Sequence, residues 1–126
     1  MIGGRVLDAS ALVAFASGTS IYAAALVWTA VEEAIVLAIP SSAIATAWNE
    51  LAEKDHPVLE VLLRLPTAVV DDLDQATARE VGARGSDLAA AHAVHCAVRR
   101  GWPLVTAYAA GYSGTAGAGV EIEQLP

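Results

Sequence analysis

The sequence predicts a single α/β domain over residues 1–126, with helices forming a layer on each face of a mostly parallel, five-stranded central sheet. The length of 126 residues is that of one domain. Apolar residue types make up 56% of the chain, which excludes intrinsic disorder. Five short apolar runs lack the polar alternation of a half-exposed strand and are separated by helical segments. This pattern is typical of parallel strands buried on both faces.

Each strand is predicted from an apolar run and from the residue that bounds it. Pro40 ends the second run, Pro66 precedes the third, and Gly101 separates the fourth from the helix before it. The predicted strands cover residues 5–8, 35–39, 68–70, 103–106 and 120–122.

Two helices in the second half of the chain have clear start signals. Asp74 is the predicted cap of a helix over residues 75–84. Ser86 is the predicted cap of a long helix over residues 87–100, which ends in two arginines and stops at Gly101. A carboxylate at the start of that long helix is favourable for the helix dipole.

The other helices are predicted from weaker start and stop signals. Either Ser41 or Ser42 is the predicted cap of a helix over residues 43–54. Further helices are expected at residues 11–16, 22–31 and 57–65, and a glycine-rich surface loop at 111–119.

The charge balance argues against binding of nucleic acid through a basic surface. The chain has 14 acidic and 7 basic side chains, a net charge of −7 and a pI near 4.7. Proteins that bind nucleic acid through their surface charge are rich in basic residues, and the acidic composition of this chain does not indicate such a basic surface. Contact with RNA or DNA would therefore require a local site or a bound metal ion.

Cysteine content and hydropathy predict an intracellular protein. Cys96 is the one cysteine, so no intramolecular disulfide forms and a reducing, cytoplasmic location is expected. The N-terminal residues run directly into a predicted strand, without an apolar signal region. The apolar stretch at 21–48 is interrupted by Glu32, Glu33 and Pro40, so we interpret it as core and expect no membrane association.

Polar residues at the ends of the predicted strands are the candidate site, because ligands of open α/β sheets bind beyond the carboxyl ends of the strands. Asp8 closes the first strand, and Thr106 and Tyr108 end the fourth. Asp87 opens the long helix, where a purely structural role in its first turn is an equal alternative. Asp8 follows two apolar residues, so its carboxylate is expected to be partly buried and to need a partner.

Four motifs in order make the chain resemble the PIN-domain family, and within it the small ribonuclease toxins of the VapC type. They are VLDASAL at 6–12, IPSSAIA at 39–45, DLAAAHA at 87–93 and GWPLVTA at 101–107. Each motif is weak alone, but the ordered set covers nearly the whole chain. The resemblance implies a three-layer PIN-like fold and a nuclease site of three or four carboxylates that holds Mg²⁺ or Mn²⁺ for RNA hydrolysis.

This chain departs from the family pattern at two site positions. By resemblance, the first acid corresponds to Asp8 and the acid at the head of the long helix to Asp87, and these are the expected metal ligands. The glutamate expected after the Ile-Pro strand corresponds to Thr46, and the acid expected after Val-Thr-Ala corresponds to Tyr108. Since affinity for hard cations falls with the number of ligand charges, metal-dependent hydrolysis is predicted to be weak or lost.

Several residues near these positions are candidate auxiliaries. Glu50 lies one helical turn after Thr46 and shares its helix face, so it either substitutes for the missing glutamate or is a solvated charge. Ser10 and Thr106 would place hydroxyls close to the site, with helix capping and strand propensity as their structural alternatives. The alternative to a nuclease is a non-catalytic PIN-like module that binds a protein or RNA.

Resemblance to the toxins also implies protein partners, namely a cognate antitoxin and a second copy of the chain. The apolar early helices at 11–16 and 22–31 are the candidate homodimer surface, since an excess of apolar helix face usually has a partner.

Two other clusters of titratable side chains are interpreted as structural. His92 and His95 lie three residues apart beside Cys96, but a zinc site needs a third or fourth donor, so they are expected along a half-buried helix face. The densest acidic cluster, after the third strand, is expected to form a solvated turn and a helix cap. Its members are Asp71, Asp72 and Asp74.

Overall fold

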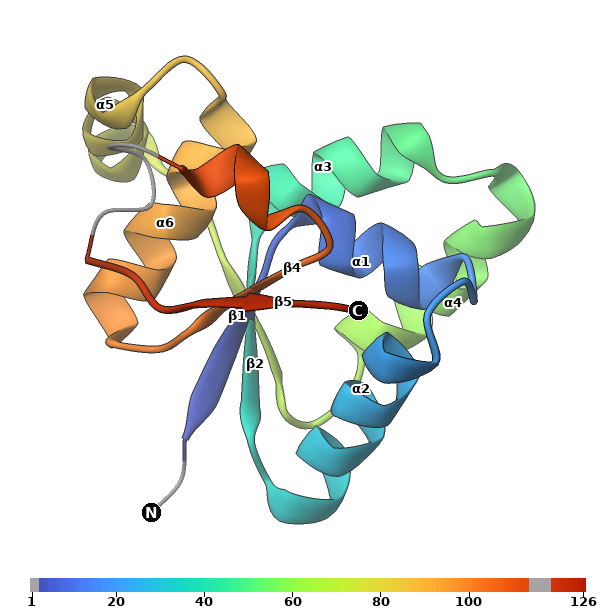
Figure 1. Ribbon diagram of the computed structural model, residues 1–126. Helices are drawn as coiled ribbons and strands as arrows, with labels where there is room; N and C mark the ends of the chain where they lie inside the picture. The colour runs from blue at the N-terminus through green and yellow to red at the C-terminus, as the bar shows by residue number, and fades with distance from the viewer. Residues whose placement is uncertain (1–2, 114–118) are drawn as a thin grey trace.

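The computed structural model describes residues 3–113 and 119–126 and contains the predicted α/β sheet (Figure 1). Its strands lie in the order β3-β2-β1-β4-β5, and every neighbouring pair is parallel. The sheet places β1 at its centre, beside β4, so the ends of these two strands adjoin. The strands are β1 Gly4–Leu7, β2 Val36–Pro40, β3 Ala68–Asp71, β4 Leu104–Thr106 and β5 Ile122–Gln124.

Successive residues of the central strands point to opposite faces of the sheet, and both faces are buried. In β1, Leu7 packs into one apolar cluster and Val6 into a second. Val105 and Leu104 of β4 divide in the same way. Burial on both faces removes the need for polar alternation, which confirms the reason for predicting a parallel sheet.

Helices cover the two faces and complete three layers (Figure 1). Helices α1 (Ala9–Ala16), α2 (Ile21–Glu33) and α4 (His56–Leu63) pack on the face of Leu7. Helices α5 (Gln75–Arg84) and α6 (Leu88–Arg100) lie on the opposite face. Helix α3 (Ser41–Glu50) lies at the carboxyl edge, against α1 and α6.

The predicted cap of α5 is confirmed, and the predicted cap of α6 is wrong. Asp74 accepts a hydrogen bond from the backbone N–H of Thr77 at 2.8 Å, and α5 has the predicted bounds. At α6 the capping residue is Asp87, which accepts from the N–H of Ala90, and Ser86 lies outside the helix. A carboxylate at the cap also interacts favourably with the positive end of the helix dipole.

The predictions for α3 are wrong at both ends. The helix begins at Ser41 directly after the extended residue Pro40, and no described side chain caps it. The Ser41 hydroxyl instead accepts from the N–H of Leu73 at 2.9 Å, a tertiary contact. The helix ends at Glu50, and a separate 3₁₀ turn, η1 (Glu53–Asp55), follows.

Strand β5 begins two residues after the predicted start. It pairs with β4 from Ile122 to Gln124, and its two polar residues are held by side-chain contacts. Glu123 pairs with Arg5 at 3.0 Å, while the Gln124 amide donates to two backbone carbonyls. These contacts stabilise polar residues in an edge strand, which apolar patterning does not detect.

The predicted loop at 111–119 lies partly outside the described residues. Its first two residues belong to a 3₁₀ turn, η2 (Ala109–Tyr112), and residues 114–118 are not among those described. Tyr112 ends this turn and is buried.

The interpretation of residues 21–48 as core holds for β2 and for the inner face of α2, but not for the outer face of α2. Ile21 and Trp28 are 77% and 68% exposed. In the described part of the chain, no single helix combines the length and apolarity needed to cross a membrane, while α1 and α2 reach both only together, across a bend of 97°.

Candidate functional site

A pocket of about 250 Å³ opens at the carboxyl ends of β1 and β4, and we call it the strand-end pocket. The structure brings all the predicted site residues to it, from strands, loops and two helices. Those residues are Asp8, Ser10, Thr46, Glu50, Asp87, Thr106 and Tyr108. They converge because the carboxyl ends of parallel strands meet at one edge of the sheet.

Asp8 is the most constrained residue of the pocket, with a side chain that is only 6% exposed. It caps α1, where Oδ1 accepts hydrogen bonds from the N–H of Ala11 at 2.9 Å and from the hydroxyl of Ser10 at 2.7 Å. Its other oxygen, Oδ2, accepts from the hydroxyl of Tyr112 at 2.6 Å. The sequence predicted that this buried carboxylate needs a partner, and the structure gives it three hydrogen-bond donors, with at least one bond to each oxygen.

Ser10 and Thr106 connect the start of α1 to the end of β4. Their hydroxyl oxygens lie 3.0 Å apart, and since Ser10 gives its proton to Asp8, Thr106 is the donor to Ser10. The N–H of Ala107 donates to Ser10 at 2.8 Å, and the N–H of Tyr108 donates to Thr106 at 3.0 Å. These bonds connect the two segments at the lining of the pocket.

Asp87 has the structural role that the sequence left open. Its Oδ1 accepts from the N–H of Ala90 at 3.1 Å as the cap of α6, and the residue is exposed at the pocket. Its carboxylate therefore adds negative charge to the pocket while one oxygen serves the helix.

The remaining three predicted residues line the pocket without adding a buried acid. Thr46 donates its hydroxyl to the carbonyl of Ser42 at 3.1 Å, a bond within its own helix. Glu50, the last residue of α3, is exposed at the rim. Tyr108 is 66% exposed and occupies a position where the family pattern has an acid.

Tyr112 is the site residue that sequence reasoning missed. It is 7% exposed, and both burial and the neighbouring Asp8 carboxylate raise the pKa of its phenol, so the hydroxyl keeps its proton. One signal was available, because Tyr112 is the single aromatic residue among the Gly, Ala, Ser and Thr residues of 109–119. An isolated large side chain in such a segment indicates an anchor into the core.

The Mg²⁺ or Mn²⁺ site that the resemblance implies does not fit this arrangement of donors. Such ions need carboxylate oxygens with free lone pairs facing a common point. Here Asp8 Oδ1 accepts two hydrogen bonds, Asp8 Oδ2 accepts one, and one oxygen of Asp87 caps a helix, so few carboxylate lone pairs remain for a cation. Among the described residues, no three His, Cys, Asp or Glu side chains group closely enough to hold a metal ion.

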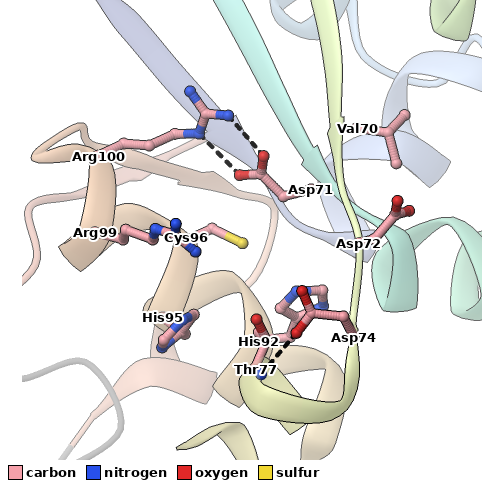
Figure 2. A pocket seen from close by; sticks show the side chains of 10 residues that line it. All are labelled: Val70, Asp71, Asp72, Asp74, Thr77, His92, His95, Cys96, Arg99 and Arg100. Atoms are coloured by element: carbon pink, nitrogen blue, oxygen red, sulfur yellow. Dashed lines mark hydrogen bonds and ion pairs between the residues drawn. The ribbon is translucent and has the colours of Figure 1, made fainter.

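A second, larger pocket of about 470 Å³ lies between the end of β3 and α6, and we call it the β3–α6 pocket (Figure 2). Asp71 lies in its wall, where Arg100 donates two hydrogen bonds to it at 2.6 and 2.8 Å. This pairing lowers the pKa of Asp71 and corrects the prediction of a solvated turn for that residue. Asp74 is the predicted cap, and Asp72 is exposed.

The histidines of α6 line the same pocket and are more deeply buried than predicted. His92 is fully buried, its Nδ1 lies 2.6 Å from the Ser42 hydroxyl, and burial lowers its pKa. Its Nε2 has no hydrogen-bond partner among the described residues. His95 is 8% exposed, with Nε2 at 3.4 Å from a Glu80 carboxylate oxygen in a contact that is not a hydrogen bond.

No protein-family model matches the chain, and a search of curated proteins finds no relative. Fold, pocket geometry and the sequence motifs therefore carry the functional proposal.

Proposed function

We propose that this chain is a PIN-like domain of the VapC toxin type, acting in the cytoplasm, in which Mg²⁺- or Mn²⁺-dependent RNA hydrolysis is weak or lost. The observation that carries the proposal is the convergence of Asp8, Thr46, Asp87 and Tyr108 on one pocket. These four positions come from motifs spread over about 100 residues, and the resemblance assigns all of them to a nuclease site. The shared edge of the sheet accounts for Asp8 and Tyr108, while Thr46 lies on α3 and reaches the same pocket as the resemblance implies.

The same pocket supports the loss of hydrolysis. A metal-dependent nuclease needs a cation to activate water and to neutralise charge on the phosphodiester. Two of the four positions lack an acid, and the buried Asp8 carboxylate is already bonded to Ala11, Ser10 and Tyr112. The exposed Glu50 adds a third carboxylate at the rim, without forming a group that holds a cation among the described residues.

RNA cleavage with added Mn²⁺ tests the proposal. We expect cleavage to be slow or absent, and any residual cleavage to disappear with EDTA and in the Asp8→Asn variant. Asp74→Asn is the matched control, because Asp74 is also a helix cap but lies outside the strand-end pocket. Micromolar Mg²⁺ affinity that Asp8→Asn abolishes would show an intact site and contradict the loss of hydrolysis.

A binding function without catalysis is the second candidate, and the outer face of α2 favours it. Ile21, Tyr22, Trp28 and Val31 are between 43% and 77% exposed on this one helix. Exposed apolar side chains gathered on one face are typical of a protein interface. By contrast, every residue of α1 is buried or half-buried, so α2 supplies the more exposed part of the predicted homodimer surface.

The occupant of this face is either a second copy of the chain or an antitoxin-like protein. Light scattering of the purified chain separates the two. A dimer that Trp28→Glu converts to a monomer supports self-association through this face. A monomeric wild-type chain contradicts self-association and favours an antitoxin-like protein as the partner. Val98→Glu is the control, since Val98 is similarly exposed on α6.

A further inference from the structure

We infer that Tyr112 is a specificity-determining residue of the strand-end pocket: its hydroxyl takes the oxygen of Asp8 that a divalent cation needs, so the pocket selects against Mg²⁺ and Mn²⁺. The inference rests on the proposed function only for the choice of these cations. The contact itself is independent of any family likeness.

The geometry makes the tyrosine a strong competitor. The distance from the Tyr112 hydroxyl to Asp8 Oδ2 is 2.6 Å, which is the short range of hydrogen bonds from a neutral hydroxyl to a carboxylate. Both side chains are more than nine-tenths buried, so water does not screen or replace the bond.

The ring of Tyr112 is held in place by the core. It packs in the apolar cluster that contains Val6 of β1, Leu104 of β4 and Val94 of α6. Moving the hydroxyl away from Asp8 therefore means withdrawing the ring from buried contacts, because protein cores are close-packed. Tyr112 belongs to η2, so this short turn brings the hydroxyl into the lining of the pocket beside Asp8.

Two features therefore weaken cation binding at this pocket: the missing acids at positions 46 and 108, and the Tyr112 hydroxyl on Asp8. Because the Tyr112 hydroxyl competes for Oδ2, the oxygen of Asp8 that Ser10 and Ala11 leave free, restoring carboxylates at positions 46 and 108 does not by itself produce a tight site. The hydroxyl must also be removed. This double requirement separates the inference from a simple count of carboxylates.

The test is a comparison of Mn²⁺ binding, measured by calorimetry and electron paramagnetic resonance, in a set of variants. The parent carries Thr46→Glu and Tyr108→Asp, and it is compared with the same protein carrying Tyr112→Phe. Removing the hydroxyl is expected to tighten Mn²⁺ binding by about 10- to 100-fold, the equivalent of one hydrogen bond to a charged group that the cation no longer has to displace. Tyr22→Phe, at an exposed tyrosine on α2, is the matched control and should change nothing.

Each outcome decides the inference. Equal Mn²⁺ affinity with and without the Tyr112 hydroxyl, or no binding in either protein, overturns it, because a purely structural tyrosine would lower only the melting temperature. If the restored parent does not fold, as judged by circular dichroism, a parent carrying Tyr108→Asp alone replaces it, and the same comparison with and without Tyr112→Phe applies. There, unchanged Mn²⁺ affinity overturns the inference.

RNA cleavage by the same variants separates this inference from the proposed function. In the variants with restored acids, tighter Mn²⁺ binding without any RNA cleavage contradicts the assignment of the pocket to a nuclease-type site and leaves the role of Tyr112 intact. RNA cleavage that appears in the parent with restored acids and does not change with Tyr112→Phe supports the proposed function and contradicts the role of Tyr112.

Discussion

Arg100 and Asp71 form a two-point ion pair that joins the end of α6 to the end of β3. Nη2 of Arg100 donates to Oδ1 at 2.6 Å, and Nε donates to Oδ2 at 2.8 Å. The two side chains are only 28% and 24% exposed, and the guanidinium also lies 5.0 Å from the centre of the Trp102 ring. Such a bidentate pair fixes geometry as well as adding stability.

Arg100→Met is therefore expected to lower the free energy of unfolding by about 1–2 kcal/mol, with urea denaturation as the measurement. The control is Arg64→Met, which breaks an exposed pair with Glu60 at 3.4 Å and should change stability by less than about 0.5 kcal/mol. Equal losses in the two variants would contradict the structural importance of the Arg100–Asp71 pair.

The same pair makes stability depend on pH in the acid range. Hydrogen bonds from Arg100 lower the pKa of Asp71 in the folded protein below its unfolded value, so the folded state favours the carboxylate. Its contribution is complete above the unfolded pKa of about 4 and is lost as pH falls through the folded pKa. Urea denaturation across the acid range, up to near-neutral pH, should show a steeper acid decline in wild type than in Arg100→Met. Parallel curves would contradict this.

Cys96 is expected to react slowly with thiol reagents in the folded protein. The side chain is 3% exposed, and burial raises the pKa of the thiol to about 12, with the Asp71 carboxylate adding to the shift. Because the thiolate is the reactive form, both effects suppress modification at mildly alkaline pH. Since Cys96 is the one cysteine in the sequence, release of a chromogenic thiol reports on it directly. A native rate close to that in denaturant would contradict the buried position.

Gly4 leaves room for the indole of Trp102, and substitution there is expected to destabilise the central strand. A Cβ at position 4 would overlap with ring atoms of Trp102. Gly4→Ala should therefore cost about 1–3 kcal/mol in thermal or urea unfolding, as overpacking does. Gly82→Ala is the matched control, because a Cβ at that position of α5 would meet nothing within 4 Å, and Ala is the better helix former by about 0.5–1 kcal/mol. The two substitutions should thus have opposite signs.

Local signals in the sequence were sufficient where a residue acts on its own neighbours. Asp74 caps the next turn of chain, and its helix has the predicted bounds. Signals were misleading where a side chain has a distant partner. Ser41 looks like a helix cap, but its hydroxyl bonds to the N–H of Leu73, 32 residues away. Capping propensity contains no information about such a contact.

The sequence by itself determined the α/β class and the approximate positions of the strands, and it placed Asp8 and Thr106 together because the carboxyl ends of parallel strands share one edge. Thr46 and Glu50, which lie on a helix, were expected at the same pocket through the family resemblance. Only the tertiary structure decided what those residues bond to. Tyr112 reaches Asp8 across 104 positions, and Arg100 reaches Asp71 across 29, through turns whose path follows from packing. Hydrophobic periodicity specifies which face of an element is buried, but the partner of a buried polar group depends on the three-dimensional path of the chain.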